Sequence, residues 1–261
     1  MLSEFDLTGK RVLITGAGRG IGRGIALVLA EAGADVGVTA LGEANAAKVA
    51  AEVQALGRKG YGWAADGTRV EPMQRVAEQA LSSLGGLDIL INCIGDAING
   101  AVAPIPGEER RVLTEADWHN VIDLNLTQAF VGCHVLGPHF IGQGSGSVIN
   151  VSSFAAVRAS AYSTAYAAAK TGLTRFTESL ALEWAPFKVR VNAIAPGSFP
   201  DLDALPPEER AQREARGAPG IPLGRAGRMR DVGLLALYLA SDASVYLTGQ
   251  SIAIDGGRSI V

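Results

Sequence analysis

A tyrosine and a lysine four residues apart, Tyr166 and Lys170, are the side chains of this sequence best suited to acid–base chemistry. They fall in a segment with helical periodicity, so both side chains lie on one face, one turn apart. A phenol ordinarily titrates at a pH of about 10, too high for efficient proton transfer at neutral pH. A neighbouring ammonium favours the phenolate and lowers that pKa. The pair therefore predicts a proton donor or acceptor adjusted by the lysine.

A serine lies thirteen residues before the tyrosine, at the end of an apolar run. The hydroxyl of Ser153 can hold and polarise a substrate oxygen beside the phenol. Ser152 is the alternative for this role. A tyrosine and lysine at this spacing occur by chance in many helices, but the preceding Val151-Ser152-Ser153 makes the pattern specific. Together these side chains predict proton transfer to or from a substrate oxygen.

A glycine-rich turn near the start of the chain predicts a site for a phosphate group. Residues 15–22 read Thr-Gly-Ala-Gly-Arg-Gly-Ile-Gly, between a predicted strand and a predicted helix. Glycine lets backbone amides approach a ligand closely. The start of the following helix offers unpaired N–H groups and the positive end of its dipole. In a βαβ unit this arrangement indicates binding of a dinucleotide pyrophosphate.

Along the chain, short apolar runs alternate with segments that have helical periodicity, and these elements must position the residues above. This alternation predicts an α/β fold with a doubly wound, Rossmann-like parallel sheet in three α/β/α layers. We expect one domain spanning residues 1–261. The predicted strands are 11–15, 35–40, 61–65, 87–92, 147–151, 189–194 and 251–254. The predicted helices are 21–32, 44–56, 72–84, 117–140, 165–184, 207–216 and 232–240.

Two segments break this rhythm. Residues 96–113 contain two prolines and no clean period, and residues 198–230 are rich in proline, arginine and glutamate. Long irregular segments within a compact domain usually form lids or binding loops. We expect the first to overhang the substrate cleft and the second to form a substrate lid.

From Leu7 to Gly257 the chain resembles the short-chain dehydrogenase/reductase family, in its compact, 3-oxoacyl-reductase-like branch. The glycine turn looks like the family's TGxxxGIG motif, and residues 92–95 resemble its NNAG segment, with Cys93 and Ile94 as departures. Pro196-Gly197 matches its PG turn, and residues 247–257 resemble its C-terminal strand and turn. Ser153, Tyr166 and Lys170 match its catalytic residues.

The resemblance implies an NAD(P)(H)-dependent oxidoreductase that interconverts a carbonyl and a secondary alcohol by hydride transfer. Tyr166 would act as the acid or base, and Lys170 would lower its pKa and bind the nicotinamide ribose. Ser153 would orient the carbonyl. Asn125, in the segment Asp-Leu-Asn-Leu, would hold a water for a proton relay.

The resemblance also implies a set of cofactor-binding residues. Asp66 would contact the adenine, although turn formation after a strand is an alternative explanation for Asp66 and Asn92. Asp201 stands where the family usually has a threonine that binds the carboxamide. The expected set is Gly16, Arg19, Gly20, Ile21, Gly22, Asp66, Asn92, Gly95, Tyr166, Lys170, Pro196, Gly197 and Phe199.

The end of the second predicted strand bears on the choice of cofactor. An acidic residue there would accept hydrogen bonds from the NAD ribose and repel a 2′-phosphate. This chain has Ala40 at that position, and Arg19 offers a positive charge nearby, unless it is simply a solvated loop residue. The pattern favours NADP(H), and Glu43 leaves NAD(H) open.

Composition and charge exclude several other functions. Of 261 residues, 48% are hydrophobic and 19% are charged, which supports a sizeable core. The net charge of −3 without a basic run gives no reason to expect nucleic acid binding, and no apolar run is long enough to span a membrane. Free Cys93 and Cys133, with no signal-peptide pattern, indicate a cytoplasmic protein. The spacing of the three histidines predicts no metal site.

A small-molecule carbonyl or alcohol is the expected partner, and the resemblance implies a homotetramer. Two other classes of protein deserve comparison. A non-catalytic, nucleotide-sensing protein of this fold would be expected to lack Tyr166 or Lys170, and both are present. Enzymes that epimerise or dehydrate nucleotide sugars usually have a longer C-terminal substrate region. The pattern names neither the substrate nor the physiological direction.

Overall fold

Seven parallel strands form one sheet in the order β3-β2-β1-β4-β5-β6-β7. The computed structural model describes residues 2–202, 205–215 and 217–261. The chain runs outward from β1 through β2 to β3 and then crosses back to β4 beside β1, so the strand order reverses between β1 and β4. The strands are β1 (Arg11–Thr15), β2 (Asp35–Ala40), β3 (Gly60–Ala64), β4 (Ile89–Asn92), β5 (Gly146–Val151), β6 (Val189–Pro196) and β7 (Ser251–Ile254).

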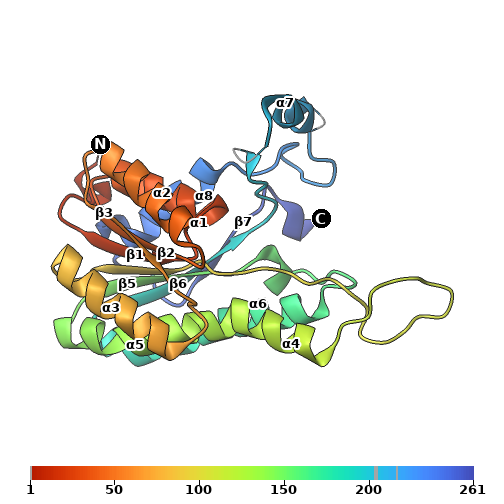
Figure 1. Ribbon diagram of the computed structural model, residues 1–261, viewed down its shortest axis with the longest axis horizontal. Helices are drawn as coiled ribbons and strands as arrows, with labels where there is room; N and C mark the ends of the chain where they lie inside the picture. The colour runs from red at the N-terminus through yellow and green to blue at the C-terminus, as the bar shows by residue number, and fades with distance from the viewer. Residues whose placement is uncertain (1, 203–204, 216) are drawn as a thin grey trace.

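Helices cover both faces of this sheet (Figure 1). Strand side chains alternate between faces, so Val12 and Ile14 join one buried cluster and Leu13 the other. The first cluster packs under α1 (Gly20–Glu31), α2 (Glu43–Ala55) and α8 (Met229–Ala240). The second packs under α3 (Val70–Leu84), α5 (Gln128–Gln143) and α6 (Thr164–Trp184). The predicted three-layer, Rossmann-like fold is confirmed.

The predicted single helix 117–140 is wrong in one respect, because a π-helical turn, Asp123–Thr127, interrupts it between α4 (Glu115–Ile122) and α5. The first turn of α4 is fixed at Glu115 by a reciprocal capping box between Thr114 and Asp117. In the π-helical turn, the side-chain amide of Asn125 donates to the carbonyl of Val121, 2.8 Å away. The other predicted strands and helices agree with the structure to within three residues, apart from residue 216, which lies outside the described residues.

The two irregular segments leave the body of the molecule (Figure 1). The loop between β4 and α4 projects outward, tied by a bridge between Ala101 and Val112 and by the Arg110 guanidinium, 3.7 Å from the centre of the Tyr162 ring. The second segment carries α7 (Pro207–Ala215), a largely exposed, charged helix. No helix in the described part of the chain is long and apolar enough to span a membrane.

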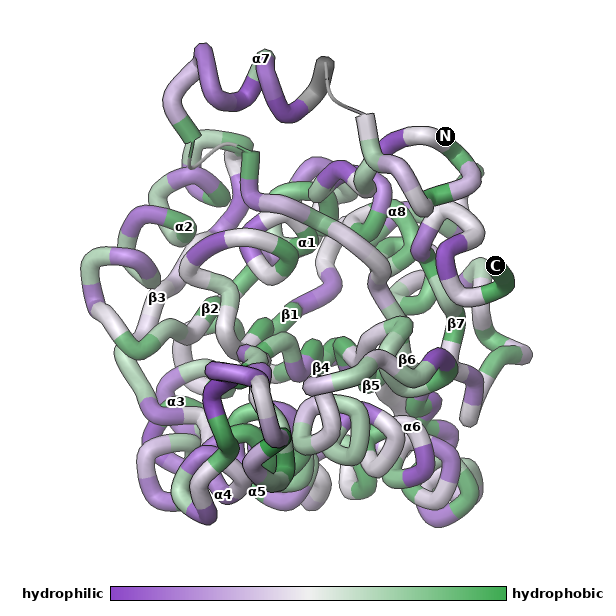
Figure 2. The backbone as a smooth tube through the Cα atoms, turned by 90° about the vertical axis from the view of Figure 1, so that its right-hand side faces the viewer, coloured by the Kyte–Doolittle hydropathy of each residue, from purple (hydrophilic) through white to green (hydrophobic). Residues whose placement is uncertain are grey.

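All strands are parallel, so their carboxyl ends meet along one edge of the sheet. Figure 2 shows the strands side by side in their sheet order, from β3 to β7. Connections leave β1 and β4 toward opposite faces, so a crevice opens between them. The glycine turn after β1, residues 93–97 after β4 and Ser152 and Ser153 after β5 all reach this edge. The fold thus brings together the segments that the sequence singled out.

Candidate active site

A cleft of about 660 Å³ runs along this edge, from the end of β2 to the start of α6. The glycine turn lines it, and so does the segment after β6. Thirteen of the predicted site residues line it: Gly16, Arg19, Gly20, Ile21, Gly22, Asp66, Gly95, Ser153, Tyr166, Lys170, Pro196, Gly197 and Phe199. Asn92 and Asn125 do not.

The glycine turn has the close backbone packing that a phosphate cradle needs. A Cβ at Gly18 would lie 2.8 Å from the Cβ of Ala40, and one at Gly22 would lie 2.8 Å from the Gly16 carbonyl oxygen. Gly20 has a φ of +56°, which side chains rarely tolerate. It opens α1, and no side chain of the N-cap residue binds the first turn of that helix. The size of the cleft, the close packing of the glycine turn and the unpaired amides at the start of α1 fit a dinucleotide. Its pyrophosphate would lie over the start of α1.

A carboxylate already faces the start of α1. The Oδ2 atom of Asp201 accepts a hydrogen bond of 3.0 Å from the backbone amide of Gly20. Asp201 belongs to the segment after β6 and also lines the cleft. From the sequence, Asp201 stands where the family usually has a threonine. In the structure its carboxylate binds the Gly20 amide.

Ser153 and Tyr166 face one another across the end of β5. Ser153 follows β5, and Tyr166 lies in the first turn of α6, which begins at Thr164. Burial raises the pKa of the Tyr166 phenol, and a hydrogen bond with Ser153 opposes that rise. The alternative serine points elsewhere, because the Ser152 hydroxyl donates to the Lys170 carbonyl, 3.1 Å away. Ser153 is therefore the serine that can share a substrate oxygen with Tyr166.

Lys170 is buried beneath the tyrosine. Its Nζ donates to the carbonyl oxygen of Val151, 2.8 Å away, and lies 5.7 Å from the centre of the Tyr166 ring. Burial lowers the pKa of Lys170 to about 8. The expected lowering of the Tyr166 pKa by Lys170 is not seen, because burial of the phenol dominates and Asp96 raises its pKa further.

Asn125 lies just behind the cleft, fully buried in the π-helical turn. Its Nδ2 donates to the Asp96 carbonyl, 2.6 Å away, as well as to Val121. Its Oδ1 has no hydrogen-bond partner and faces Gly95, where an added Cβ would lie 2.9 Å from it and 3.1 Å from Lys170 Nζ. A glycine at position 95 thus lets this buried acceptor approach the lysine.

Asn92 does not belong to the cleft, contrary to the prediction. Its side chain turns inside the fold, where Nδ2 donates to the Asn150 Oδ1, 2.9 Å away, and lies 3.5 Å from the Cys133 Sγ. Asn150 in turn donates to Thr177 on α6. Successive strand side chains point to opposite faces, and this one points toward α5. Asn92 therefore links β4, β5 and α6.

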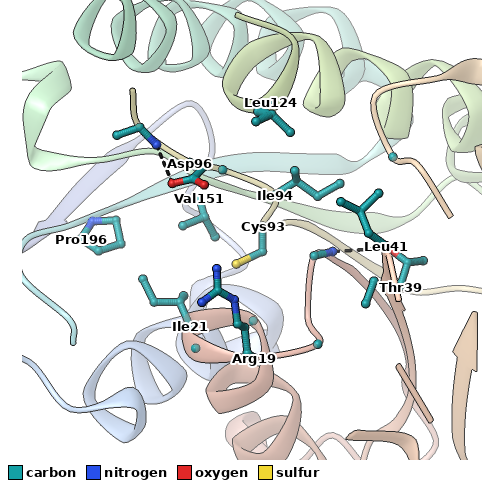
Figure 3. A pocket seen from close by; sticks show the side chains of 18 of the residues that line it. Arg19, Ile21, Thr39, Leu41, Cys93, Ile94, Asp96, Leu124, Val151 and Pro196 are labelled. Atoms are coloured by element: carbon teal, nitrogen blue, oxygen red, sulfur yellow. Dashed lines mark hydrogen bonds between the residues drawn. The ribbon is translucent and has the colours of Figure 1, made fainter. Parts of the chain in front are cut away.

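The far end of the cleft is formed by the residues after β2. Thr39, Ala40, Leu41, Gly42 and Asn45 line it, and no acidic side chain is among them. Glu43 is exposed at the start of α2 and does not line the cleft. Figure 3 shows the Arg19 side chain extending from the glycine turn into the cleft.

Asp66 lines the cleft, and its side chain also forms the turn after the third strand that was the alternative explanation for this residue. Its Oδ1 accepts hydrogen bonds from the backbone amide of Thr68, at 2.9 Å, and from its hydroxyl, at 2.6 Å. The turn therefore fixes the orientation of the carboxylate beside the cleft, and the two explanations for Asp66 are compatible.

Asp96 and Cys93 are among the lining residues that were not singled out as site residues from the sequence. Asp96 lines the cleft (Figure 3). Its carboxylate raises the pKa of the Tyr166 phenol. Its place directly after Gly95 was the available signal. The thiol of Cys93 also lines the cleft, and burial raises its pKa to about 12, so it stays protonated at neutral pH.

The chain is similar to known proteins over nearly its whole length. A family model described as enoyl-(acyl carrier protein) reductase matches residues 16–259. The chain is 37% identical over 254 residues to a 3-oxoacyl-[acyl-carrier-protein] reductase of Chlamydia pneumoniae, covering 97% of this chain and 98% of that one. It is 34% identical over 258 residues to a 2-dehydro-3-deoxy-D-gluconate 5-dehydrogenase of Escherichia coli, covering 98% of both.

A solved structure has the same fold over nearly the whole chain. It is a short-chain type dehydrogenase/reductase from Mycobacterium marinum, 34% identical, with a TM-score of 0.85 and 98% of each chain covered. The alignment thus spans the sheet, the glycine turn and the segment after β6.

Proposed function

The chain belongs to the short-chain dehydrogenase/reductase family, and we propose that it uses NADP(H), with Tyr166 as its acid and base. It is an NAD(P)-dependent oxidoreductase that interconverts carbonyl and secondary alcohol groups. The observation that carries the proposed roles is the single cleft shared by the glycine turn, Ser153, Tyr166 and Lys170. Nothing in the comparisons supports a non-catalytic, nucleotide-sensing protein.

The bound nicotinamide supplies or accepts the hydride at the substrate carbon, and the protein handles the proton. In the reducing direction Ser153 donates a hydrogen bond to the substrate oxygen and holds it near Tyr166. The Tyr166 hydroxyl then gives its proton to that oxygen. In the oxidising direction the phenolate takes the proton back. Because its pKa is raised, the Tyr166 phenol is neutral at neutral pH and carries the proton that it gives to the substrate oxygen.

Lys170 and Asn125 support this transfer. An ammonium has three donors, and the contact with Val151 uses one of them, leaving two for ribose hydroxyls and for the phenolate. The free Oδ1 of Asn125 beside Lys170 suits an ordered water that passes protons onward. We assign Lys170 as the group that stabilises the phenolate and Asn125 as the group that orients the water.

The preference for NADP(H) rests on charge. The residues after β2 present no carboxylate to repel a 2′-phosphate, and Arg19 places a cation in the cleft. The glycine turn, Ile21, Asp66, Gly95 and the residues after β6 complete the proposed cofactor site.

Assembly and domain organisation extend the proposal. We expect one domain, with residues 198–230 as the substrate lid, in a cytoplasmic homotetramer. Exposed apolar side chains on the outer helices, Phe130 on α5 and Leu182 on α6, are 48% and 79% accessible and would be covered by assembly. Light scattering on the purified protein measures the assembly directly.

Turnover with defined carbonyl compounds tests the function. NADPH and NADH are each offered with a 3-oxoacyl thioester, a sugar-derived keto acid and a cyclic ketone, and nicotinamide absorbance is followed. We expect faster oxidation of NADPH than of NADH with at least one of these substrates. Faster oxidation of NADH would overturn the cofactor assignment, and no oxidation of either would count against the proposed roles.

A further inference from the structure

The lid reaches the anion site of the glycine turn through one side chain. Asp201 and Gly20 are far apart in the sequence, yet the Asp201 carboxylate accepts the Gly20 amide hydrogen at 3.0 Å. Gly20 is the first residue of α1 and carries one of the amides that the helix itself cannot pair. The lid therefore occupies this donor.

The lid segment is held in place beside this contact. The amide of Gly227 donates to the Ser198 carbonyl at 2.9 Å, closing the base of the lid. The Phe199 ring packs so closely on Gly227 that an added Cβ there would lie 2.3 Å from it. The chain from Ser198 to Asp201 thus runs from a fixed base to the start of α1.

A pyrophosphate and a carboxylate compete for such a site. Both are anions that need the same unpaired amides and the same positive end of the helix dipole. When both are present they also repel one another. A dinucleotide lying over α1 must therefore displace Asp201 from Gly20.

We propose that Asp201 is a latch that sets cofactor affinity: it occupies the anion site at the start of α1, and the dinucleotide must release it to bind. The inference rests on the proposed function, because it needs a dinucleotide in this cleft. It predicts that the apparent dissociation constant contains the cost of opening the latch. It also couples cofactor binding to the position of the lid that borders the substrate end of the cleft.

Removing the charge while keeping the shape isolates the latch. Asp201→Asn retains an oxygen at the same place but neither repels a pyrophosphate nor binds the amide as strongly. We expect it to bind NADPH about tenfold more tightly, which corresponds to a latch closed in about nine molecules of ten. Glu208→Gln removes a carboxylate from exposed α7, outside the cleft, and serves as the matched control with unchanged affinity.

Two readouts separate a latch from a simple helix cap. NADPH dissociation constants are measured by nicotinamide fluorescence, and thermal midpoints are measured with and without NADPH. For a latch, Asp201→Asn lowers the midpoint of the cofactor-free protein but tightens NADPH binding and enlarges the shift that NADPH produces. If Asp201→Asn lowers the midpoint but leaves NADPH binding unchanged or weaker, Asp201 only caps α1, and the proposal is overturned.

The same titrations distinguish this proposal from the proposed function. If wild type binds NADPH and Asp201→Asn binds it no more tightly, the latch alone is refuted. If neither protein binds NADPH or NADH, the dinucleotide site itself is refuted, and the latch with it.

Discussion

The ammonium of Lys170 donates a hydrogen bond of 2.8 Å to the carbonyl oxygen of Val151, the last residue of β5. This contact joins the helix that carries Tyr166 to the strand that leads to Ser153. It also holds a lysine that is only 2% exposed, and burial lowers the pKa of that lysine to about 8. A buried charge of this kind favours function at the expense of stability.

Replacing Lys170 with methionine should therefore stabilise the cofactor-free protein while abolishing turnover. Methionine fills a similar volume and removes the cost of burying the ammonium, although the Val151 carbonyl loses a donor. We expect the free energy of unfolding at pH 7 to rise by about 1–2 kcal/mol. Urea unfolding measures it, and a loss of stability would show that the contact with Val151 outweighs the burial cost.

The same variant gives a pH prediction. Folding lowers the pKa of Lys170 to about 8, below its unfolded value, so the unfolded state binds more protons at pH values between the two. Stability from this group rises as the pH rises through that window, by up to about 1.4 kcal/mol per pH unit. The advantage of Lys170→Met over wild type should shrink from pH 8 to pH 10. A constant difference across this range would contradict the lowered pKa.

The two neighbouring serines should separate catalysis from structure. Ser153→Ala should lower kcat about 10²-fold or more, with little change in NADPH affinity, because the donor to the substrate oxygen is lost. Ser152→Ala, whose hydroxyl faces the Lys170 carbonyl, should retain most of its turnover and lose about 1 kcal/mol of stability. Steady-state kinetics and unfolding on both variants check this, and the reverse ranking of kcat would reassign the serine.

Arg19 should contribute to NADP(H) preference. Arg19→Gln removes the cation that extends into the cleft and should weaken NADPH binding by about tenfold or more. NADH lacks the 2′-phosphate, so its affinity is the internal control and should change far less. Fluorescence titration measures both affinities. If NADPH and NADH binding weaken equally, Arg19 contacts the pyrophosphate instead of the 2′-phosphate.

A pair of glycines tests the packing that supports the site. Gly24 lies where α1 meets α8, and a Cβ there would lie 2.5 Å from the Cβ of Met229. Gly24→Ala should cost about 2–3 kcal/mol through overpacking. Gly142, an exposed residue in α5 with open space around it, is the control. Gly142→Ala should stabilise the protein by about 0.5–1 kcal/mol. Thermal midpoints of the two variants check this, and similar shifts for both would contradict the account.

The sequence predicted the fold well because the signals were local. Seven short apolar runs and the helices between them gave the sheet, and the spacing of Ser153, Tyr166 and Lys170 identified one end of the cleft. The glycine turn identified the other. Each of these patterns depends on residues close in the chain or on strands that end at a common edge.

The remaining features depend on contacts that no local pattern encodes. At the π-helical turn, the side-chain amide of Asn125 donates to a backbone carbonyl four residues earlier. The inward direction of Asn92 depends on Asn150 in the neighbouring strand. The Tyr166 pKa depends on burial and on Asp96, and the contact of Asp201 with Gly20 depends on the path of the lid. These relationships appear only when the chain is folded.

The most direct test of the central claim is the turnover of Tyr166→Phe with NADPH binding measured alongside. Phenylalanine keeps the ring and removes only the hydroxyl that transfers the proton. We expect nicotinamide oxidation with a substrate that wild type reduces to fall by about 10³-fold, while the NADPH dissociation constant stays within about threefold of wild type. Turnover close to the wild-type rate would contradict the account, because the proton would then come from another group.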